Sequence, residues 1–344
     1  MRFSILIPVY NTEKYIEECL QSIFSQTFSD YQIVLVDDGS TDNSSEICNK
    51  YKDRHPDKIK VIHQENQGQL ASRCKAIKEA DGEYCIFMDA DDLIVEDALE
   101  ILNTNLNKFD NPDMFIYSFY YENEDGTLRK ADKLFDDGIV FNISNKNELY
   151  KKFFTGTGLN NVWTKAVKRS ILTSIDIDLN KYSNLRCSED KLHSMYMIDT
   201  CKTVVFKDIP LYRYRLFEGS VTRRFTVENI EKFNTIQLYK DEKDFLYKWN
   251  LDLPEWKYKL DSQWVKAAFY VFDLFYNNVP RNKRKFLLNY NWCSFLNEEI
   301  ISEINDNPFL NDTYKKIWTW IINKNYSSLK MYFLGKRIRK KLRK

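Results

Sequence analysis

The chain of 344 residues has no Cys-x-x-Cys pair, only three histidines and no long apolar run. Its seven cysteines are scattered and odd in number, which argues against a disulfide framework or a zinc site and favours reduced thiols. The most apolar long stretch, 264–276, is about thirteen residues and contains Lys266 and Asp273, so it is too short and too charged to span a bilayer. The first apolar run, from Phe3, is needed as a strand, so we expect no signal peptide and a cytoplasmic location.

Acidic residues are scarce in one place, the C-terminal segment 330–344, which holds eight Lys or Arg and no Asp or Glu. Because the whole chain carries a net charge of +1, residues 1–329 carry −7. Leu334, Ile338 and Leu342 recur every fourth residue, so a helix here has an apolar stripe flanked by cations. This pattern favours contact with an anionic membrane surface, and a solvated or disordered tail is the alternative. We expect no nucleic-acid partner, because the rest of the chain is acidic.

What the sequence does contain is ordinary globular composition, 43% apolar and 29% charged, with enough length for one large domain or two. Within it, three carboxylates, Asp89, Asp91 and Asp92, follow the buried apolar run 84–88. Clustered carboxylates repel each other unless a cation lies between them, and oxygen ligands select Mg²⁺ or Mn²⁺. A metal site is therefore one interpretation, and capping of the helix that follows is the other.

Other apolar runs also end in polar residues. The runs 3–9, 33–36 and 58–62 are predicted strands, and a helical stretch, 13–26, follows the first of them. Strands that alternate with helices indicate a parallel sheet with right-handed crossovers, whose carboxyl edge carries the ligand site. The polar residues expected at that edge are Tyr10, Asn11, Asp37, Asp38, Asn66, Gly68, Asp89 and Asp91.

Four motifs occur in a familiar order within about the first ninety residues. They are Pro-Val-Tyr-Asn-x-Glu at 8–13, Val-Asp-Asp-Gly-Ser-Thr-Asp at 36–42, Asn-x-Gly at 66–68 with Ala-Ser-Arg at 71–73, and Met-Asp-Ala-Asp-Asp at 88–92. Together they resemble the family-two inverting glycosyltransferases with the GT-A nucleotide-sugar fold. Weaker matches are Ser188-Glu189-Asp190 and the stretches 211–215 and 219–223, so the resemblance covers residues 1 to about 225. One departure is Cys74-Lys75-Ala76, where the family often has Asn-x-Gly after the arginine.

The resemblance implies an α/β fold of the GT-A type, Rossmann-like, with a mostly parallel sheet flanked by helices and a C-terminal helical module. It implies Asp91 and Asp89 as ligands of Mn²⁺ or Mg²⁺, and Asp190 as the catalytic base with Glu189 beside it. Asp38 resembles the acid that contacts the uracil ring, which favours a UDP-sugar as the donor. The nucleotide-sugar residues expected from the family are Pro8, Tyr10, Asn11, Glu13, Asp38, Asn66, Gly68, Arg73, Asp89, Ala90 and Arg215. Trp163 and Lys165 are expected at the acceptor.

For the organisation of the chain we expect a glycosyltransferase domain at 1–225, with a nucleotide-binding half at 1–110 and an acceptor half at 111–225. The segment 122–140 is predicted as a hairpin or long loop. Residues 226–344 are predicted to form a helical region, interrupted near Pro254, Pro280 and Pro308, that ends in the basic tail 330–344. These C-terminal helices are also the expected surface for a homodimer.

The expected function is transfer of a sugar from a UDP-sugar to a hydroxyl of a saccharide acceptor, with inversion at the sugar. A lipid-linked acceptor, in the assembly of capsule or another cell-surface polysaccharide, would agree with a protein on the inner face of the plasma membrane. Two alternatives remain open: a transferase that acts on a protein or soluble acceptor, and a catalytically silent module that binds nucleotide sugars. Release of UDP from the donor distinguishes the silent module from both enzymes.

Overall fold

The computed structural model describes residues 1–156, 158–182, 185, 188–217, 236–278, 280, 296 and 298–342. By its internal contacts the chain divides into two compact units, residues 1–220 and 221–344, which are taken separately below. The predicted boundary at residue 225 and the motif at 219–223 lie outside the described residues.

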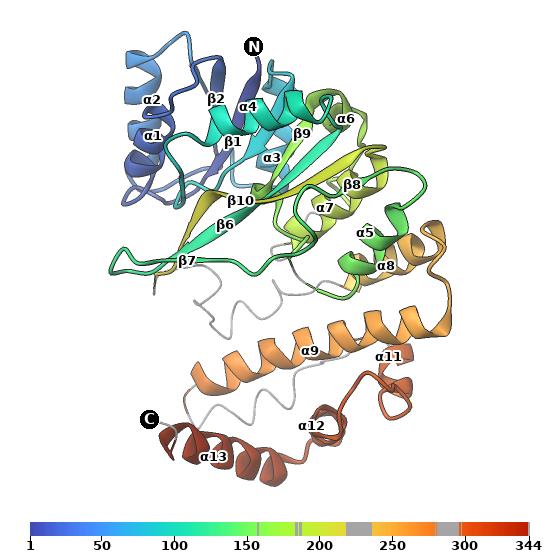
Figure 1. Cartoon of the computed structure of the whole chain (residues 1–344). Helices are drawn as coiled ribbons and strands as arrows, with labels where there is room; N and C mark the ends of the chain where they lie inside the picture. Colours follow the sequence, from blue (N-terminus) through green and yellow to red (C-terminus); the bar gives the residue numbers. More distant parts are fainter. Residues whose placement is uncertain are drawn as a thin grey trace. The chain divides into compact units, whose positions relative to one another are not determined.

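The first unit is built on one ten-stranded sheet with helices on its faces (Figure 1). The strand order is β3-β2-β1-β4-β9-β6-β10-β5, with β7 paired to β6 and β8 paired to β10. The strands are β1 (Phe3–Val9), β2 (Tyr31–Asp37), β3 (Ile59–His63), β4 (Tyr84–Phe87), β5 (Leu93–Ile94), β6 (Met114–Glu122), β7 (Leu128–Lys130), β8 (Val140–Phe141), β9 (Lys165–Lys168) and β10 (Val204–Arg215). The helices are α1 (Ile16–Phe24), α2 (Ser44–Arg54), α3 (Gln69–Glu79), α4 (Ala98–Lys108), α5 (Lys146–Phe153), α6 (Arg169–Ser174) and α7 (Glu189–Thr200), with the 3₁₀ turn η1 at Val162–Thr164.

Strands β1 to β4 form the parallel half of this sheet. β1 pairs in parallel with both β2 and β4, and β2 pairs in parallel with β3. Every residue of β2 and β4 is buried, as expected for strands covered by helices on both faces. The carboxyl ends of these strands therefore lie at one edge of the sheet, and the alternating α/β architecture expected from the sequence is confirmed.

The other half of the sheet mixes directions. β9 runs antiparallel to both β4 and β6, whereas β10 runs parallel to β6. In the segment 122–140, predicted as a hairpin or long loop, β7 folds back on β6 as a short hairpin, with Glu122 opposite Leu128. β5 follows directly after the acidic loop 88–92 and pairs with β10, so β10 runs close to that loop.

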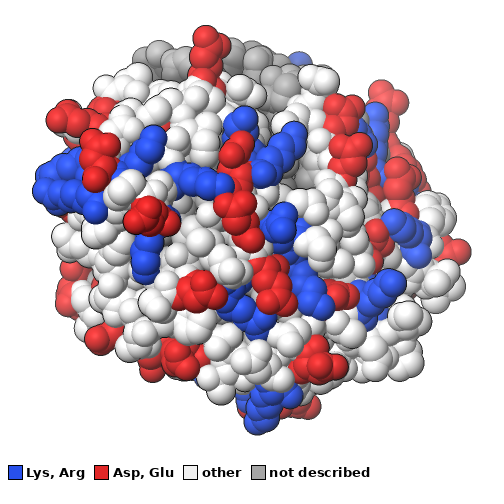
Figure 2. Space-filling model, turned by 90° about the horizontal axis from the view of Figure 1, so that it is seen from above, with Lys and Arg blue, Asp and Glu red and all other residues white. Residues whose placement is uncertain are grey.

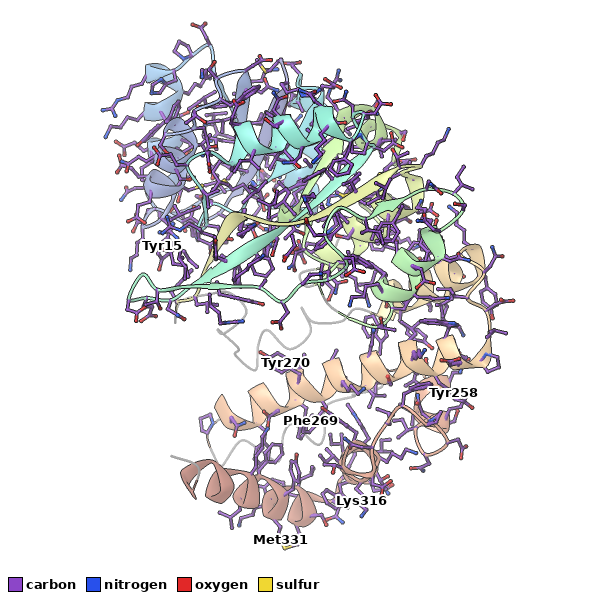
Figure 3. All side chains as sticks on the ribbon, in the orientation of Figure 1. Tyr15, Tyr258, Phe269, Tyr270, Lys316 and Met331 are labelled. Carbon is purple, nitrogen blue, oxygen red and sulfur yellow. The ribbon has the colours of Figure 1, made fainter. Side chains whose placement is uncertain are left out.

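The second unit is helical as predicted. Its described helices are α8 (Ile236–Lys248), α9 (Pro254–Asn278), α11 (Glu298–Glu303), α12 (Asp312–Ile322) and α13 (Tyr326–Leu342). Aromatic side chains fill its core, and Phe269 of α9 (labelled in Figure 3) lies edge-on to Tyr314 of α12 with ring centroids 5.4 Å apart. The basic segment 330–344 is thus helical as far as Leu342, within a helix that begins at Tyr326.

Two surface properties bear on partners. Among the described residues, no helix combines the length and hydropathy that a bilayer-crossing segment needs. On the face seen in Figure 2, Lys and Arg are interspersed with Asp and Glu, and no large area of one charge is visible.

Candidate active site

Hydrogen bonds of Asp92 and Tyr212 connect the acidic loop 88–92, which follows β4, to strand β10. The Tyr212 hydroxyl donates to Asp92 Oδ2 at 2.7 Å and accepts from the Asp89 backbone N–H at 3.1 Å. Asp92 Oδ1 accepts from the Arg215 backbone N–H at 2.9 Å. Asp92 is 1% exposed, and burial, with Asp91 and Asp89 nearby, raises its pKa well above the ordinary value. Asp92 therefore anchors the loop to β10, while the other two acids remain at the sheet edge.

Asp89 lies at the centre of the site. Its Oδ1 accepts from Gln69 Nε2 at 2.9 Å and from Arg73 Nη2 at 3.1 Å. Burial raises its pKa to about 7, and the neighbouring Asp190 and Asp91 add to the rise, whereas Arg73 opposes it. Gln69 was missed by the sequence analysis, although a signal existed: Gln69 and Arg73 are four residues apart and so share one face of α3.

Arg73 joins Asp89 to the predicted catalytic base. Its Nη1 donates to Asp190 Oδ1, while its Nη2 reaches Asp89. Burial alone would lower the pKa of Arg73, but attraction to Asp190 and Asp89 more than offsets this and raises it. The guanidinium is 1% exposed, against 22% for the Asp89 side chain and 25% for that of Asp190. A single buried cation thus links Asp89, just after β4, to Asp190, at the start of α7.

Besides Arg73 Nε, three buried polar atoms on or beside α7 have no hydrogen-bond partner among the described residues: Glu189 Oε2, His193 Nδ1 and Asn160 Oδ1. Burial and the charge of Asp190 raise the pKa of Glu189. Burial and the charge of Arg73 lower the pKa of His193 to about 3, so its imidazole is neutral at pH 7. Of these three residues, only Glu189 is a site residue expected from the sequence. Nothing in the local pattern places Asn160 beside α7, where Ser194 Oγ donates to the backbone carbonyl of Asn160 at 2.7 Å.

Asp91 presents the carboxylate with the fewest protein contacts in this loop. Its backbone carbonyl accepts from Arg215 Nε at 2.5 Å, but no described side chain bonds to its carboxylate. Burial raises the pKa of Asp91, because the ionised carboxylate loses hydration there, and a nearby cation would stabilise the ionised form. Both hydrogen bonds that Asp89 accepts from described side chains end on Oδ1, which leaves Oδ2 available, so Asp91 and Asp89 fit the oxygen ligands that Mg²⁺ or Mn²⁺ takes. Among the described residues, no three His, Cys, Asp or Glu side chains are arranged to hold a metal ion by themselves, so the remaining ligands would come from water or substrate.

Arg215 is occupied within the protein. Besides the Asp91 carbonyl, its guanidinium donates to Glu18 and, at 3.5 Å, to the Tyr15 carbonyl. It also lies 5.2 Å from the centroid of the Tyr15 ring, which packs on Phe217 (Tyr15 is labelled in Figure 3). Arg215 thus fastens the end of β10 to α1, and its expected contact with the nucleotide sugar stays a prediction.

The turn after β1 is tied to the loop after β2. Asn11, with φ of 53°, accepts at Oδ1 from the Thr41 backbone N–H at 2.8 Å. Glu13 accepts at Oε2 from the Asn43 backbone N–H at 3.0 Å. Pro8 is partly buried, and Tyr10 is 50% exposed. Of these expected nucleotide-binding residues, Tyr10 therefore has the ring best placed to meet a ligand from solvent.

Asp38 organises the loop after β3. Its Oδ1 accepts from Gln64 Nε2 and the Gln67 backbone N–H, and its Oδ2 accepts from the Gly68 backbone N–H, each at 2.8 Å. Gly68 has φ of 92°, a conformation that favours glycine. Asp38 is 3% exposed, so its predicted contact with uracil, which stays a prediction, would share oxygens that already hold this loop. Asn66 in the same loop is exposed, and Ala90 is buried.

Trp163 and Lys165 lie inside the unit. Trp163 is 5% exposed and stacks on Tyr212 and Tyr214, with ring centroids 4.6 and 5.4 Å away. Lys165 is fully buried and donates to the carbonyls of Leu159, at 2.9 Å, and Asn161. Burial lowers the pKa of Lys165 to about 7, although Asp190 opposes this. Trp163 and Lys165 thus pack against residues inside the unit, and direct contact of either residue with an acceptor stays a prediction.

Comparisons with known proteins find relatives by sequence and structures of similar fold. A model of the family "Glycosyl transferase family 2" matches residues 4–173. EpsH of Bacillus subtilis, assigned as a glycosyltransferase, is 33% identical over 259 residues, which cover 75% of this chain and 73% of EpsH. The glycosyltransferase GlyG of Streptococcus pneumoniae is 32% identical over 228 residues, covering 64% of this chain and 72% of GlyG.

Two more relatives are informative in different ways. The poly(ribitol-phosphate) β-glucosyltransferase of Bacillus spizizenii is 47% identical over 102 residues, 29% of this chain and 16% of that enzyme. The crystal structure of S. aureus TarS 1-349 in complex with UDP-GlcNAc superposes with a TM-score of 0.62 at 20% identity, covering 94% of this chain and 88% of that one. At this identity the likeness to TarS shows the fold.

Proposed function

The chain belongs to glycosyltransferase family 2, and from this premise we propose that it moves a sugar from a UDP-sugar to a hydroxyl of a saccharide acceptor, with inversion. The observation that carries the proposal is the Arg73 guanidinium, which joins Asp89 on the donor side to Asp190. A silent binding module would not need a partly exposed carboxylate, Asp190, aligned with the donor-side acid by a buried cation.

In the proposed reaction the acceptor oxygen attacks the anomeric carbon, and its proton passes to Asp190. The bond from that carbon to the diphosphate breaks, and its electron pair leaves with UDP. A base must lie beside the attacking oxygen, and Asp190 combines 25% exposure with an orientation set by Arg73 Nη1. Glu189, whose pKa burial raises, is suited to donate a hydrogen bond to the acceptor in its protonated form.

The family implies a divalent cation, and Asp91 with Asp89 Oδ2 would hold Mn²⁺ or Mg²⁺ at the sheet edge. Such a cation supplies neutralisation of the charge that develops on the departing diphosphate. The protein's own part there is to position the two carboxylates, through Tyr212, Asp92 and Gln69.

UDP is the proposed nucleotide, with a hexose or N-acetylhexosamine as the transferred sugar. The TarS complex with UDP-GlcNAc and the β-glucosyltransferase of Bacillus spizizenii support this choice. A lipid-linked saccharide in the assembly of capsule or another cell-surface polysaccharide is the proposed acceptor.

The test is a screen of UDP-sugars for UDP release, with and without Mn²⁺ and saccharide acceptors. In the Asp190→Asn variant we expect UDP-sugar affinity close to wild type and transfer reduced by about a hundredfold or more, as for removal of a general base. Asp176→Asn is the matched control, since Asp176 is exposed in the loop between α6 and α7. Equal losses of donor affinity and turnover in Asp190→Asn would place Asp190 in the nucleotide pocket, and release of UDP from no UDP-sugar would overturn the proposal.

A further inference from the structure

One face of α13 is buried against α9 in the second unit. Leu329 is fully buried and Phe333 is 2% exposed. The Phe333 ring stacks on Tyr276 of α9 with ring centroids 3.9 Å apart, and it also lies 6.1 Å from Phe272. This packing fixes which side of α13 faces the protein.

An ion pair fixes the same orientation. Lys336, one turn after Phe333, places its Nζ 2.9 Å from both carboxylate oxygens of Asp273 on α9. Because Leu329, Phe333 and Lys336 follow helical spacing, the opposite side of α13 has to face away from α9. The start of the basic segment, as far as Lys336, therefore packs on α9, and deletion of residues 330–344 would remove part of this packing.

The outer side of α13 is apolar and exposed. Met331 is 68% exposed and Leu334 is 58% exposed, and their three-residue spacing puts them on one face. Figure 3 shows Met331 on the side of α13 that points away from α9. In the sequence, Ile338 and Leu342 follow Leu334 at four-residue intervals, and the segment 330–344 has eight cations and no acid.

We propose that this outer face of α13 docks on an anionic lipid bilayer, with Met331 and Leu334 entering the interface and the flanking cations other than Lys336 at the headgroups. An apolar stripe flanked by Lys and Arg has the charge and shape that such a surface binds. A second copy of the chain would instead bring eight further cations against the first eight, and a nucleic acid would leave the apolar side chains without a partner. The inference rests on the proposed function only for its purpose, which is to bring the site to a lipid-linked acceptor.

The experiment measures sedimentation of the full chain with vesicles of phosphatidylcholine, with and without phosphatidylglycerol, in the absence of any donor. We expect binding only to the anionic vesicles, and a loss of at least tenfold in Met331→Asp and Leu334→Asp. Leu253→Asp is the matched control. Leu253 is 61% exposed just before α9, and about 30 Å of helix separates it from the stretch of α9 that α13 covers.

Circular dichroism of each variant verifies that the helices remain, since both substituted side chains are exposed. Anionic-vesicle binding that survives in both Met331→Asp and Leu334→Asp would overturn the inference. So would gel filtration in which Leu334→Asp turns a lipid-free dimer into a monomer, because a second copy would then cover this face. Since no donor is present, the result stands or falls independently of the UDP-release screen.

Discussion

Replacement of Arg73 by methionine tests the link between the two sides of the site. Methionine approximates the length of the side chain but leaves Asp89, Asp190 and Glu189 without their shared cation. Removal of one partner of a buried ion pair typically costs about 3–5 kcal/mol, because the remaining charge stays buried. Asp89 and Asp190 keep 22% and 25% exposure, so water relieves part of that cost. We expect the free energy of unfolding to fall by about 3 kcal/mol and, for a unit of this size, the melting temperature to fall by roughly 6–12 °C.

The same substitution should change the pH dependence of transfer. Arg73 lowers the pKa of Asp89, which is still raised to about 7 in its presence. Without Arg73 that pKa rises further, so Asp89 stays protonated at neutral pH and the acidic limb of the rate profile moves to higher pH.

The assays are thermal unfolding and kcat/KM for transfer from about pH 6 to pH 9. Arg169→Met is the control, because Arg169 is an exposed arginine that donates to the Gly82 carbonyl. Relative to Arg73→Met, the double variant Arg73→Met/Asp190→Asn should regain part of the stability but none of the activity, since it removes one of the two carboxylates left without a cation. If the free energy of unfolding of Arg73→Met fell by less than about 1 kcal/mol and its pH profile did not shift, the assignment of Arg73 as a buried ion-pair bridge would be refuted.

Two further predictions concern the cation and the buried lysine. Asp91→Asn should remove the stimulation of UDP release by Mn²⁺ or Mg²⁺ while thermal unfolding stays near wild type, and wild-type activity that persists in EDTA would contradict the metal assignment. Lys165 has a pKa of about 7 when folded and an ordinary value of 10.5, so the unfolded state binds more protons between these values. Relative to Lys165→Met, the wild-type free energy of unfolding, from urea titrations, should therefore rise with pH above 7 by up to about 1.4 kcal/mol per pH unit, and parallel curves would contradict this.

The parallel half of the fold could be predicted because its signal is local. β2 and β4 are wholly buried, so their residues form continuous apolar runs bounded by turns. β9 could not be predicted, because its sequence lacks such an apolar run. Its sequence, Lys-Ala-Val-Lys, begins with a lysine that is fully buried in the middle of the sheet because two backbone carbonyls accept its hydrogen bonds.

The site was only partly predictable for the same physical reason. Acids that follow buried strands can be read from the sequence, and so Asp89 and Asp91 were. The bond between Arg73 and Asp190 spans 117 residues, and it depends on the packing of α3 against α7, which no local pattern encodes. The same holds for Asp38, whose type was read from a motif but whose three hydrogen bonds to the loop 64–68 depend on where that loop lies.

The order of strands in the sheet also limits how this chain could be recombined with its relatives. β5, from the first hundred residues, lies at the far edge beyond β10, and β9 is inserted between β4 and β6. An exchange of residues 1–110 alone would separate two strand pairings, β4 with β9 and β5 with β10, and the Tyr212–Asp92 hydrogen bond. Chimeras that aim to change the donor sugar should therefore take all strands up to the end of β10 from the same parent protein.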